Sequence, residues 1–228
     1  MIMESVLNAA SVARGRFERF RLKRRLENLK AAGMHIGQGV NMPASTWIDA
    51  SHAHLISIGD WCGFGEQCLI LAHDAQMSEF LDVRLVNRVV LHESCHFGSR
   101  TVILPGVEVG PRTLVGANSV VSRSLPPDSV CAGAPARVLC TLDEYLARHR
   151  ERMSRAVEFP WADYNPDVLT AARRAEIEAA VQDGRPAYLR GGFSEELRGA
   201  GGTQRTPMGR DARPYGMVWL EGRQRDAS

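Results

Sequence analysis

The sequence predicts a mainly β protein: a stack of six-residue repeats, with a helix before it and a helical extension after it. Residues 97–126 divide into five consecutive sixes without a gap. The first position of each six is apolar, and it is filled by Phe97, Ile103, Val109, Val115 and Val121. A period of six fits neither the 3.6-residue turn of a helix nor the two-residue alternation of a strand. It fits short strands joined by turns, which bury their apolar faces only when several repeats stack.

Two further positions in each six support the stack. Glycine takes the second position three times, at Gly98, Gly110 and Gly116, where we expect the chain to turn a corner. The fifth position is small or apolar, as Thr101, Val107, Thr113, Ser119 and Leu125. Counting from Ile36, about twelve such units precede residue 127, which makes roughly four triangular coils. Residues 75–88 break the period and are predicted to form a protruding loop, the usual place for binding residues.

The segments around the stack have their own composition. Residues 1–32 predict a basic helix, with eight Arg or Lys against two Glu between Arg14 and Lys30. Its apolar face consists of Leu22, Leu26 and Leu29, and we expect it to cover the open end of the stack. Contact with an anionic membrane surface is the alternative, whereas no nucleic acid partner is expected. Residues 141–190 predict helices, and the glycine- and arginine-rich residues 191–228 predict a disordered tail.

Composition narrows the functional class and the compartment. The chain has 228 residues, a net charge of +2 and no apolar run long enough to span a membrane. Its five cysteines lack CxxC spacing, which argues against a disulfide framework and for the reducing cytoplasm. Cys62, Cys68 and Cys95 stand at fifth positions of their sixes, so we expect them to fill the core. The basic helix adds the inner face of the membrane as a second expected location.

Two segments resemble a known family. IGDWCGFGEQCLILAHDA (residues 58–75) and the run from FGSRTVILPGVEVG to GAPARVL (residues 97–139) resemble the hexapeptide-repeat acyltransferases. The closer likeness is to the maltose and galactoside O-acetyltransferase branch and its polysaccharide-cluster relatives, and it covers residues 33–140. The resemblance implies a left-handed parallel β-helix and a homotrimer with active sites between neighbouring subunits. It also implies acetyl-CoA or another acyl-CoA as the co-substrate, with no metal.

Acyl transfer to a hydroxyl or an amine requires a general base. Moving an acyl group from a thioester to a hydroxyl or an amine requires a group that removes the acceptor's proton, and histidine suits this near neutral pH. The resemblance places the catalytic histidine at His73, directly before the loop. Asp74 follows it and is a second catalytic candidate, which would orient the imidazole or bind the acceptor. Adjacent residues of a strand point to opposite sides, which weakens a direct contact between the two.

The resemblance also implies where coenzyme A binds. Ser99 and Ala117, eighteen residues apart, would line the groove for the pantetheine arm. Ser122 and Arg123 stand where the family has a Thr-Lys pair, and Arg123 keeps the positive charge for a phosphate. The adenine end would be bordered by a turn that includes Gly133, Pro135 and Arg137. Relatives often have another basic residue three positions after Arg137, where this chain has Cys140, which puts the phosphate contacts there in doubt.

We therefore expect an O-acetyltransferase that acts on a sugar or a related small acceptor, and three alternatives stay open. One is an N-acyltransferase for an amino sugar, and another is a non-catalytic β-helix scaffold. The third is a zinc-dependent γ-type carbonic anhydrase, which needs three converging histidines. The only candidates are His73, His92 and His96, of which the last two are four apart where that family uses five.

Overall fold

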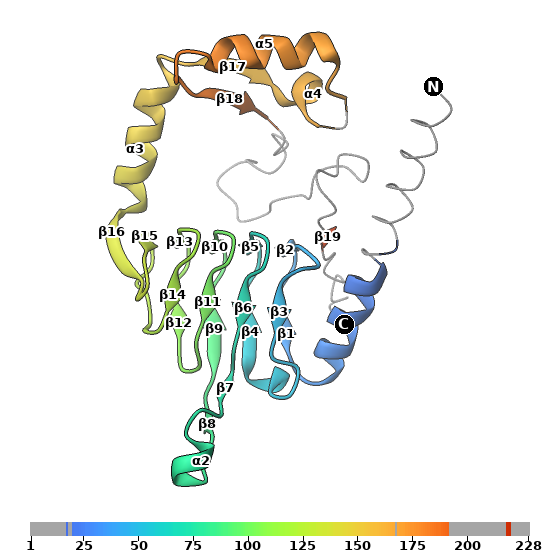
Figure 1. Ribbon diagram of the computed structural model, residues 1–228, viewed down its shortest axis with the longest axis vertical. Coiled ribbons are helices and arrows are strands. Elements are labelled where there is room, and N and C mark those ends of the chain that lie inside the picture. The colour runs from blue at the N-terminus through green and yellow to red at the C-terminus, as the bar shows by residue number, and fades with distance from the viewer. Residues whose placement is uncertain (1–16, 18–19, 167, 192–217, 220–228) are drawn as a thin grey trace, which may run out of the picture. The chain divides into compact units, whose positions relative to one another are not determined.

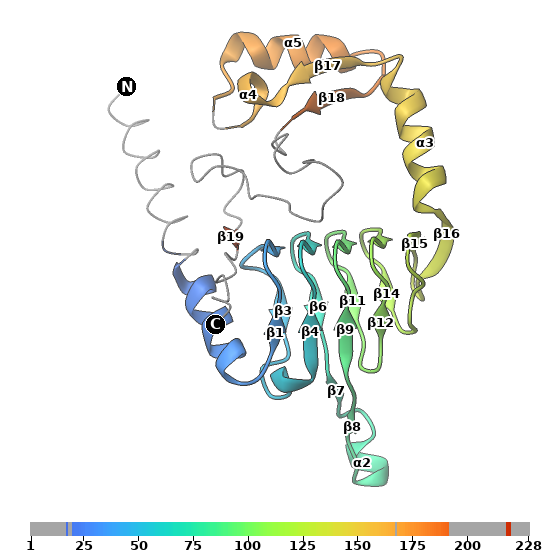
Figure 2. The same cartoon turned by 180° about the vertical axis from the view of Figure 1, so that it is seen from behind.

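The computed structural model describes residues 17, 20–166 and 168–191, and the backbone of residues 218–219. The chain forms two compact units that divide between Leu142 and Asp143, with residues 218–219 joined to the first unit. The first unit is a stack of short strands joined by tight corners, shown from opposite sides in Figures 1 and 2.

Three parallel sheets make the sides of this stack. The first sheet contains β1 (His35–Ile36), β4 (Ile56–Ile58), β9 (Val89–Leu91) and β12 (Glu108–Val109). The second contains β2 (Asn41–Met42), β5 (Gly63–Phe64), β10 (His96–Phe97), β13 (Leu114–Val115) and β15 (Ser129–Ala132). The third contains β3 (Trp47–Ile48), β6 (Leu69–Ile70), β11 (Val102–Ile103) and β14 (Val120–Val121). Antiparallel strands extend the second sheet at both edges: β16 (Arg137–Thr141) beside β15 and β19 (Val218–Trp219) beside β2.

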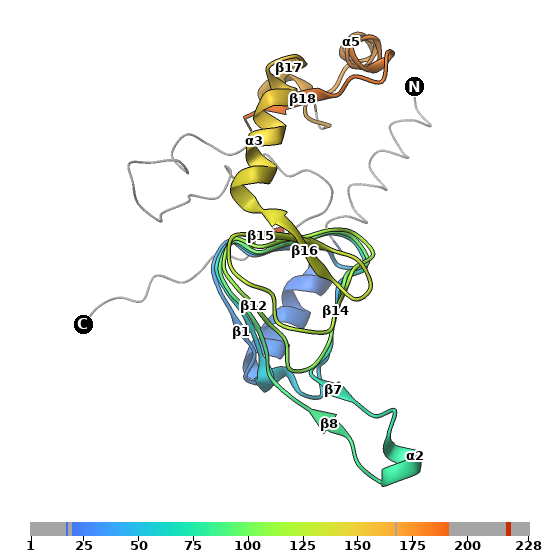
Figure 3. The ribbon, with the colours of Figure 1, turned by 90° about the vertical axis from the view of Figure 1, so that its left-hand side faces the viewer.

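The coil is left-handed. Figure 3 views the stack from the end at β15, and there the chain runs clockwise from β12 through the second sheet to β14. Successive coils come towards the viewer in that view, and a clockwise path that approaches the viewer is a left-handed screw. The prediction of a mainly β, left-handed parallel β-helix is therefore confirmed.

The predicted repeat positions form the core. The first positions stack in register, so that Phe64, Phe97, Val115 and Cys131 lie in one ladder, with the two phenyl rings stacked at 5.0 Å. The cysteines at fifth positions, Cys62, Cys68 and Cys95, are fully buried, and none of the five cysteines forms a disulfide. The buried hydroxyls of Thr101, Thr113 and Ser119 donate to corner carbonyls, as Thr101 Oγ1 does to Gly98 O at 2.7 Å. These three small polar residues therefore fit the interior with their donors paired.

At the second position of the sixes, glycine allows close approach of neighbouring coils. A Cβ on Gly98 would lie 2.4 Å from the backbone nitrogen of Ala117 in the next coil, so a side chain there would push the coils apart. Many of the turns also contain a residue in the left-handed conformation directly before a buried residue. Seven of these residues are not glycine: Trp61, Gln67, Ser94, Arg100, Arg112, Asn118 and Asp128. Hydrogen bonds to the neighbouring coil stabilise the turn at these positions.

The helix before the stack closes its N-terminal end. Residues 20–31 are helical, and Leu22, Leu26 and Leu29 are buried in the same cluster as the first coils of the β-helix. Arg25 Nη1 donates to Thr46 O at 2.8 Å, which ties the helix to the first coil. The predicted cap is confirmed for these residues. Since the leucine face packs inward, the exposed face of residues 20–31, which carries basic side chains and Phe20, is left for any contact with a membrane surface.

The predicted loop is an arm that leaves the stack between β6 and β9. It contains β7 (His73–Asp74), α2 (Ser78–Leu81) and β8 (Leu85–Val86), and β7 and β8 pair antiparallel. Figure 3 shows the arm projecting away from the coils. Several large apolar side chains of the arm are exposed, with Phe80 the most exposed of them at 81%.

The second unit contains a pair of strands as well as helices. It contains most of α3 (Leu142–Met153), then α4 (Trp161–Tyr164) and α5 (Ala171–Val181). It also contains β17 (Val157–Pro160) and β18 (Ala187–Arg190), a parallel pair that the sequence analysis missed. The predicted disorder of residues 191–228 lies outside the described residues, apart from Gly191 and β19. Every helix in the described part is too short or too polar to cross a bilayer.

Replacing Leu26 with alanine tests the cap. Leu26 is 1% exposed, so its loss should lower the free energy of unfolding by about 2–4 kcal/mol through lost burial and the cavity left behind. Urea unfolding of the full chain measures this. Glu27→Ala, on the exposed side of the same turn, should stay within about 0.5 kcal/mol of the wild type. Equal stability of the two variants would contradict the packing described.

Candidate active site

His73 stands where the arm begins. The third sheet still holds the chain at Leu71, whose N–H donates to Ile103 O at 2.9 Å in the next coil. Ala72 is buried, and His73 then pairs with Val86 at the base of the arm. The side chain of His73 is 30% exposed, so one part of its ring contacts protein and another part is open to solvent.

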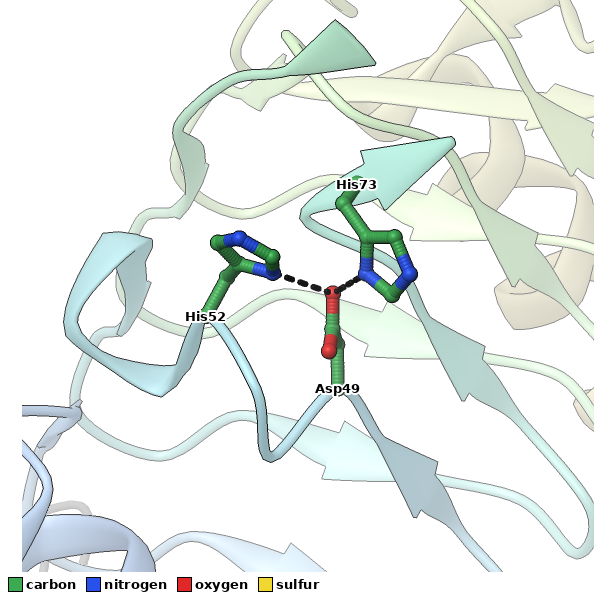
Figure 4. A group of neighbouring side chains, drawn as sticks. All are labelled: Asp49, His52 and His73. Atoms are coloured by element: carbon green, nitrogen blue, oxygen red, sulfur yellow. Dashed lines mark hydrogen bonds and ion pairs between the residues drawn. The ribbon is translucent and has the colours of Figure 1, made fainter. Parts of the chain in front are cut away.

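A buried carboxylate lies beside this histidine. Asp49 follows β3 in the neighbouring coil and is 1% exposed. One carboxylate oxygen accepts from Ser51 Oγ at 2.5 Å and from Ser51 N–H at 3.2 Å. The other accepts from Ala72 N–H at 3.2 Å and shares a short hydrogen bond with Nδ1 of His73. Figure 4 shows this carboxylate pointing at the imidazole.

The environment keeps Asp49 ionised. Burial on its own raises the pKa of this carboxyl, but hydrogen bonds from Ser51, His73 and the Ala72 backbone outweigh that effect and lower the pKa below its ordinary value. An ionised carboxylate can only accept hydrogen bonds, so the proton between the two groups belongs to Nδ1 of His73. Nε2 of the neutral ring then carries a lone pair. This is the tautomer that a general base requires.

A second histidine completes the group. His52 precedes the 3₁₀ helix η1 (Ala53–Leu55), and its Nδ1 lies 3.7 Å from the carboxylate oxygen of Asp49 that bonds His73. The rings of His52 and His73 are 4.9 Å apart at an angle of 42°. Ser51 Oγ lies 3.0 Å from His52 Nδ1. We call the three side chains that meet here, Asp49, His52 and His73, the Asp-His-His cluster.

Sequence reasoning missed Asp49, although the repeat contains a signal for it. In the first two sheets the residue after the strand is usually glycine, whereas at the third corner it is never glycine: Asp49, Leu71, Leu104 and Ser122. Side chains are therefore accommodated at one corner of every coil, the corner from which the arm also leaves. Only Leu104 and Ser122 among the four are eighteen residues apart, so a regular spacing along the chain does not reveal Asp49.

Asp74 bonds the backbone of the arm and not the imidazole of His73. Its Oδ1 accepts the N–H of Gln76 at 2.8 Å, a bond within the turn that starts the arm. The carboxylate that bonds the ring of His73 comes from Asp49 instead. A catalytic role for Asp74 stays a prediction, and its visible contact is with the arm backbone.

The predicted coenzyme A residues form two rows. Ser99, Ala117 and Gly133 occupy the same corner in three consecutive coils, between the second and third sheets; Asn118 N–H donates to Ser99 O, and Val120 N–H to Gly133 O, both at 2.9 Å. Ala117 and Gly133 are exposed and Ser99 is half-buried. Pro135 and Arg137 are exposed beyond this row, in the turn from β15 to β16 and at the start of β16.

The second row lies on the corner of His73. Ser122 and Arg123 follow β14 and are exposed, two strands along the third sheet from β6. At about 4.8 Å per strand this is roughly 10 Å from the coil that precedes His73. The structure therefore brings His73 and Arg123 to one edge of the stack, and it places Ser99 and Ala117 on another.

The three-histidine arrangement of the carbonic anhydrase alternative does not form within the described part of one chain. His92 Nε2 bonds Glu108 at 2.7 Å, and His96 lies on β10 in the second sheet. Among the described residues, the Asp-His-His cluster is the one group of three such side chains whose ligand atoms converge.

Asp49→Asn should change how stability depends on pH. Because the folded-state pKa of Asp49 is lowered, its charge stabilises the fold above the ordinary aspartate pKa of about 3.9, and this contribution is lost as pH falls through the lower folded value. Urea unfolding should show the wild type more stable by about 1–3 kcal/mol near neutral pH, with the gap closing in acid. Asp82→Asn, at the exposed tip of the arm, is the matched control and should show no gap. A gap that is independent of pH would contradict this account.

Known proteins are similar to the part of the chain that contains the β-helix. The model for the bacterial transferase hexapeptide (six repeats) matches residues 88–123, which run from β9 through β14. The solved acetyltransferase VCA0836 of Vibrio cholerae, complexed with acetyl coenzyme A, is similar over 58% of this chain and 90% of its own, at 20% identity and a TM-score of 0.40.

Two curated relatives are similar in sequence. "Putative acetyltransferase YvoF" of Bacillus subtilis is 26% identical over 125 residues, which are 55% of this chain and 68% of that protein. Galactoside O-acetyltransferase of Escherichia coli is 36% identical over 56 residues, and the chain spans only 28% of its length there. With the transferase repeat at the centre of its β-helix and relatives that are named acetyltransferases, the chain is similar to the hexapeptide-repeat acyltransferases.

Proposed function

We propose that the protein transfers an acetyl group from acetyl-CoA to a hydroxyl of a sugar or a related small acceptor. The observation that carries this proposal is the hydrogen bond between buried Asp49 and Nδ1 of His73, which leaves Nε2 as a base at the foot of the arm. The name of the Escherichia coli relative, a galactoside O-acetyltransferase, supports an O-linked product on a sugar. An amine would lose its proton to the same base, so an amino sugar is the acceptor to test beside it.

His73 supplies the proton transfers of the reaction. Its Nε2 accepts the hydroxyl proton of the acceptor while the oxygen attacks the thioester carbonyl, and a C–O bond forms. Asp49, a positioning residue, stabilises the imidazolium through Nδ1. When the intermediate collapses, the C–S bond breaks and Nε2 returns its proton to the leaving thiolate. No bond forms between the acyl group and the protein, so the mechanism requires no serine or cysteine nucleophile.

The two rows of predicted residues fit the parts of coenzyme A. Small residues at Ser99, Ala117 and Gly133 leave the corner flat enough for a narrow pantetheine arm to run along it. Exposed Arg123 and Arg137 offer guanidinium groups to phosphates, with Ser122 and Pro135 beside them. These assignments are part of the proposal.

A homotrimer is part of the same proposal. The two rows lie on different corners of one stack, so a groove that uses both is completed most simply by a neighbouring copy. The arm also exposes Phe80, Leu81 and Val83 by 81%, 64% and 47%, an apolar surface that contact with another subunit would cover. Cyclic symmetry would then repeat the same active site three times.

Two variants separate catalysis from binding. His73→Asn should lower the rate of acetyl transfer by about 100- to 10,000-fold, because the base is lost, while acetyl-CoA binding by calorimetry stays near the wild-type value.

Arg123→Ala should weaken acetyl-CoA binding, because a phosphate contact is lost. Arg112→Ala is its control: Arg112 is also an exposed corner arginine, but it lies on another corner and bonds Asp128 at 2.5 Å.

Mass spectrometry of products from a panel of sugars and amino sugars reads out the transfer. Turnover by His73→Asn equal to that of the wild type would contradict the proposed base. Failure of the wild type to bind any acyl-CoA would contradict the proposed reaction and favour the scaffold alternative.

A further inference from the structure

The Asp-His-His cluster contains one histidine that the transfer reaction does not use. Asp49 and His73 suffice to orient and supply the base, yet His52 also turns its Nδ1 towards the same carboxylate oxygen (Figure 4). One ligand atom from each of the three residues lies within 4.8 Å of the other two. Carboxylate oxygen and imidazole nitrogen are both common ligands of zinc in proteins.

The spacing of the ligand atoms suits a tetrahedral ion. Zinc bonds nitrogen and oxygen at about 2.0–2.2 Å, which sets neighbouring ligand atoms roughly 3.3 Å apart. His52 Nδ1 is already 3.7 Å from the Asp49 oxygen, so it needs little adjustment. Nδ1 of His73 would have to draw back from the carboxylate, because the ion would replace the proton between them. The side chains of His52 and His73 are 27% and 30% exposed, so an ion can reach them from solvent.

The cluster also offers a fourth ligand. Ser51 Oγ, which lies 3.0 Å from His52 Nδ1 and 3.5 Å from His73 Nδ1, or a water molecule can fill the fourth position.

We propose that the Asp-His-His cluster binds Zn²⁺, and that the bound ion switches off His73 as a base. The second half of this statement rests on the proposed acetyl transfer, whereas the first half does not. Zinc would bond Asp49 Oδ2 and the Nδ1 atoms of His52 and His73, with one position left for Ser51 or water.

The switch follows from the tautomer of His73. A neutral imidazole has one N–H and one lone pair. When zinc takes the lone pair at Nδ1, the ring proton must reside on Nε2, so Nε2 becomes a donor and can no longer accept the proton of the acceptor. The ring proton moves from Nδ1 to Nε2. Zinc should therefore inhibit by removing the base rather than by blocking coenzyme A.

Zinc titration of the full chain, with no acyl-CoA present, tests the site. Calorimetry should show one site per chain that is weakened at least tenfold in His52→Gln and in Asp49→Asn. His54→Ala is the matched control, since this exposed histidine has its ring 6.3 Å from that of His52 and lies outside the cluster. Substituting Co²⁺ should give a spectrum without the intense thiolate band that a cysteine site would produce. Equal zinc affinity in the wild type and both cluster variants would overturn the proposal.

Inhibition is measured separately. Zinc should inhibit acetyl transfer by the wild type and by His54→Ala at equal concentrations, and should inhibit His52→Gln only at concentrations at least tenfold higher. Equal inhibition of all three proteins would overturn the switch. Capture of zinc by the released coenzyme A thiol would give this result, because it does not depend on the protein variant. If the protein binds zinc through the cluster but transfers no acetyl group, the zinc site is supported and the proposed function is refuted.

Discussion

The hydrogen bond between Asp49 and His73 is the interaction on which the account of this site depends. It joins two coils, because Asp49 follows β3 and His73 follows β6, its neighbour in the third sheet. The β-helix makes the contact by parallel pairing of Ile48 with Ile70, which brings residues more than twenty positions apart to the same corner. The carboxylate also accepts the N–H of Ala72, so it fixes the point at which the chain leaves the stack for the arm. Asp49 therefore stabilises the local backbone and orients the imidazole of His73 at the same time.

The three corners of the stack have different tasks. At the first two, glycines such as Gly59 and Gly98 let adjacent coils approach so closely that an added Cβ would lie within 2.7 Å of backbone atoms. At the third, larger residues follow the strands and the arm emerges. Regular stacking is thus maintained by small residues on two corners, and chemistry is concentrated on the corner that accommodates side chains. The same division explains why a short repeat can support a site without losing its register.

Much of this could be predicted from the sequence, because a six-residue period constrains both strands and core. The buried cysteines and the arm after His73 follow from matches and breaks in that period, and the helix of Leu26 follows from the spacing of its leucines. Asp49 did not follow, because its contact with His73 depends on which coils are neighbours, and spacing along the chain does not reveal this. The positive φ at residues such as Arg100 and Asn118 was missed for a similar reason: bonds from the neighbouring coil stabilise it. The β17–β18 pair was missed because strong helical patterns on both sides dominated that region.

The most direct test of this account is the tautomer of His73, measured by nitrogen-15 NMR of the imidazole rings near neutral pH, with His73→Asn used to assign the signals. We predict that the neutral form of the wild-type ring carries its proton on Nδ1 and a lone pair on Nε2, because ionised Asp49 can only accept a hydrogen bond. In Asp49→Asn this preference should weaken or reverse, since the amide can also donate. A wild-type ring protonated at Nε2 alone, or the same tautomer mixture in both proteins, would contradict the role given to Asp49 and remove the basis for His73 as the general base.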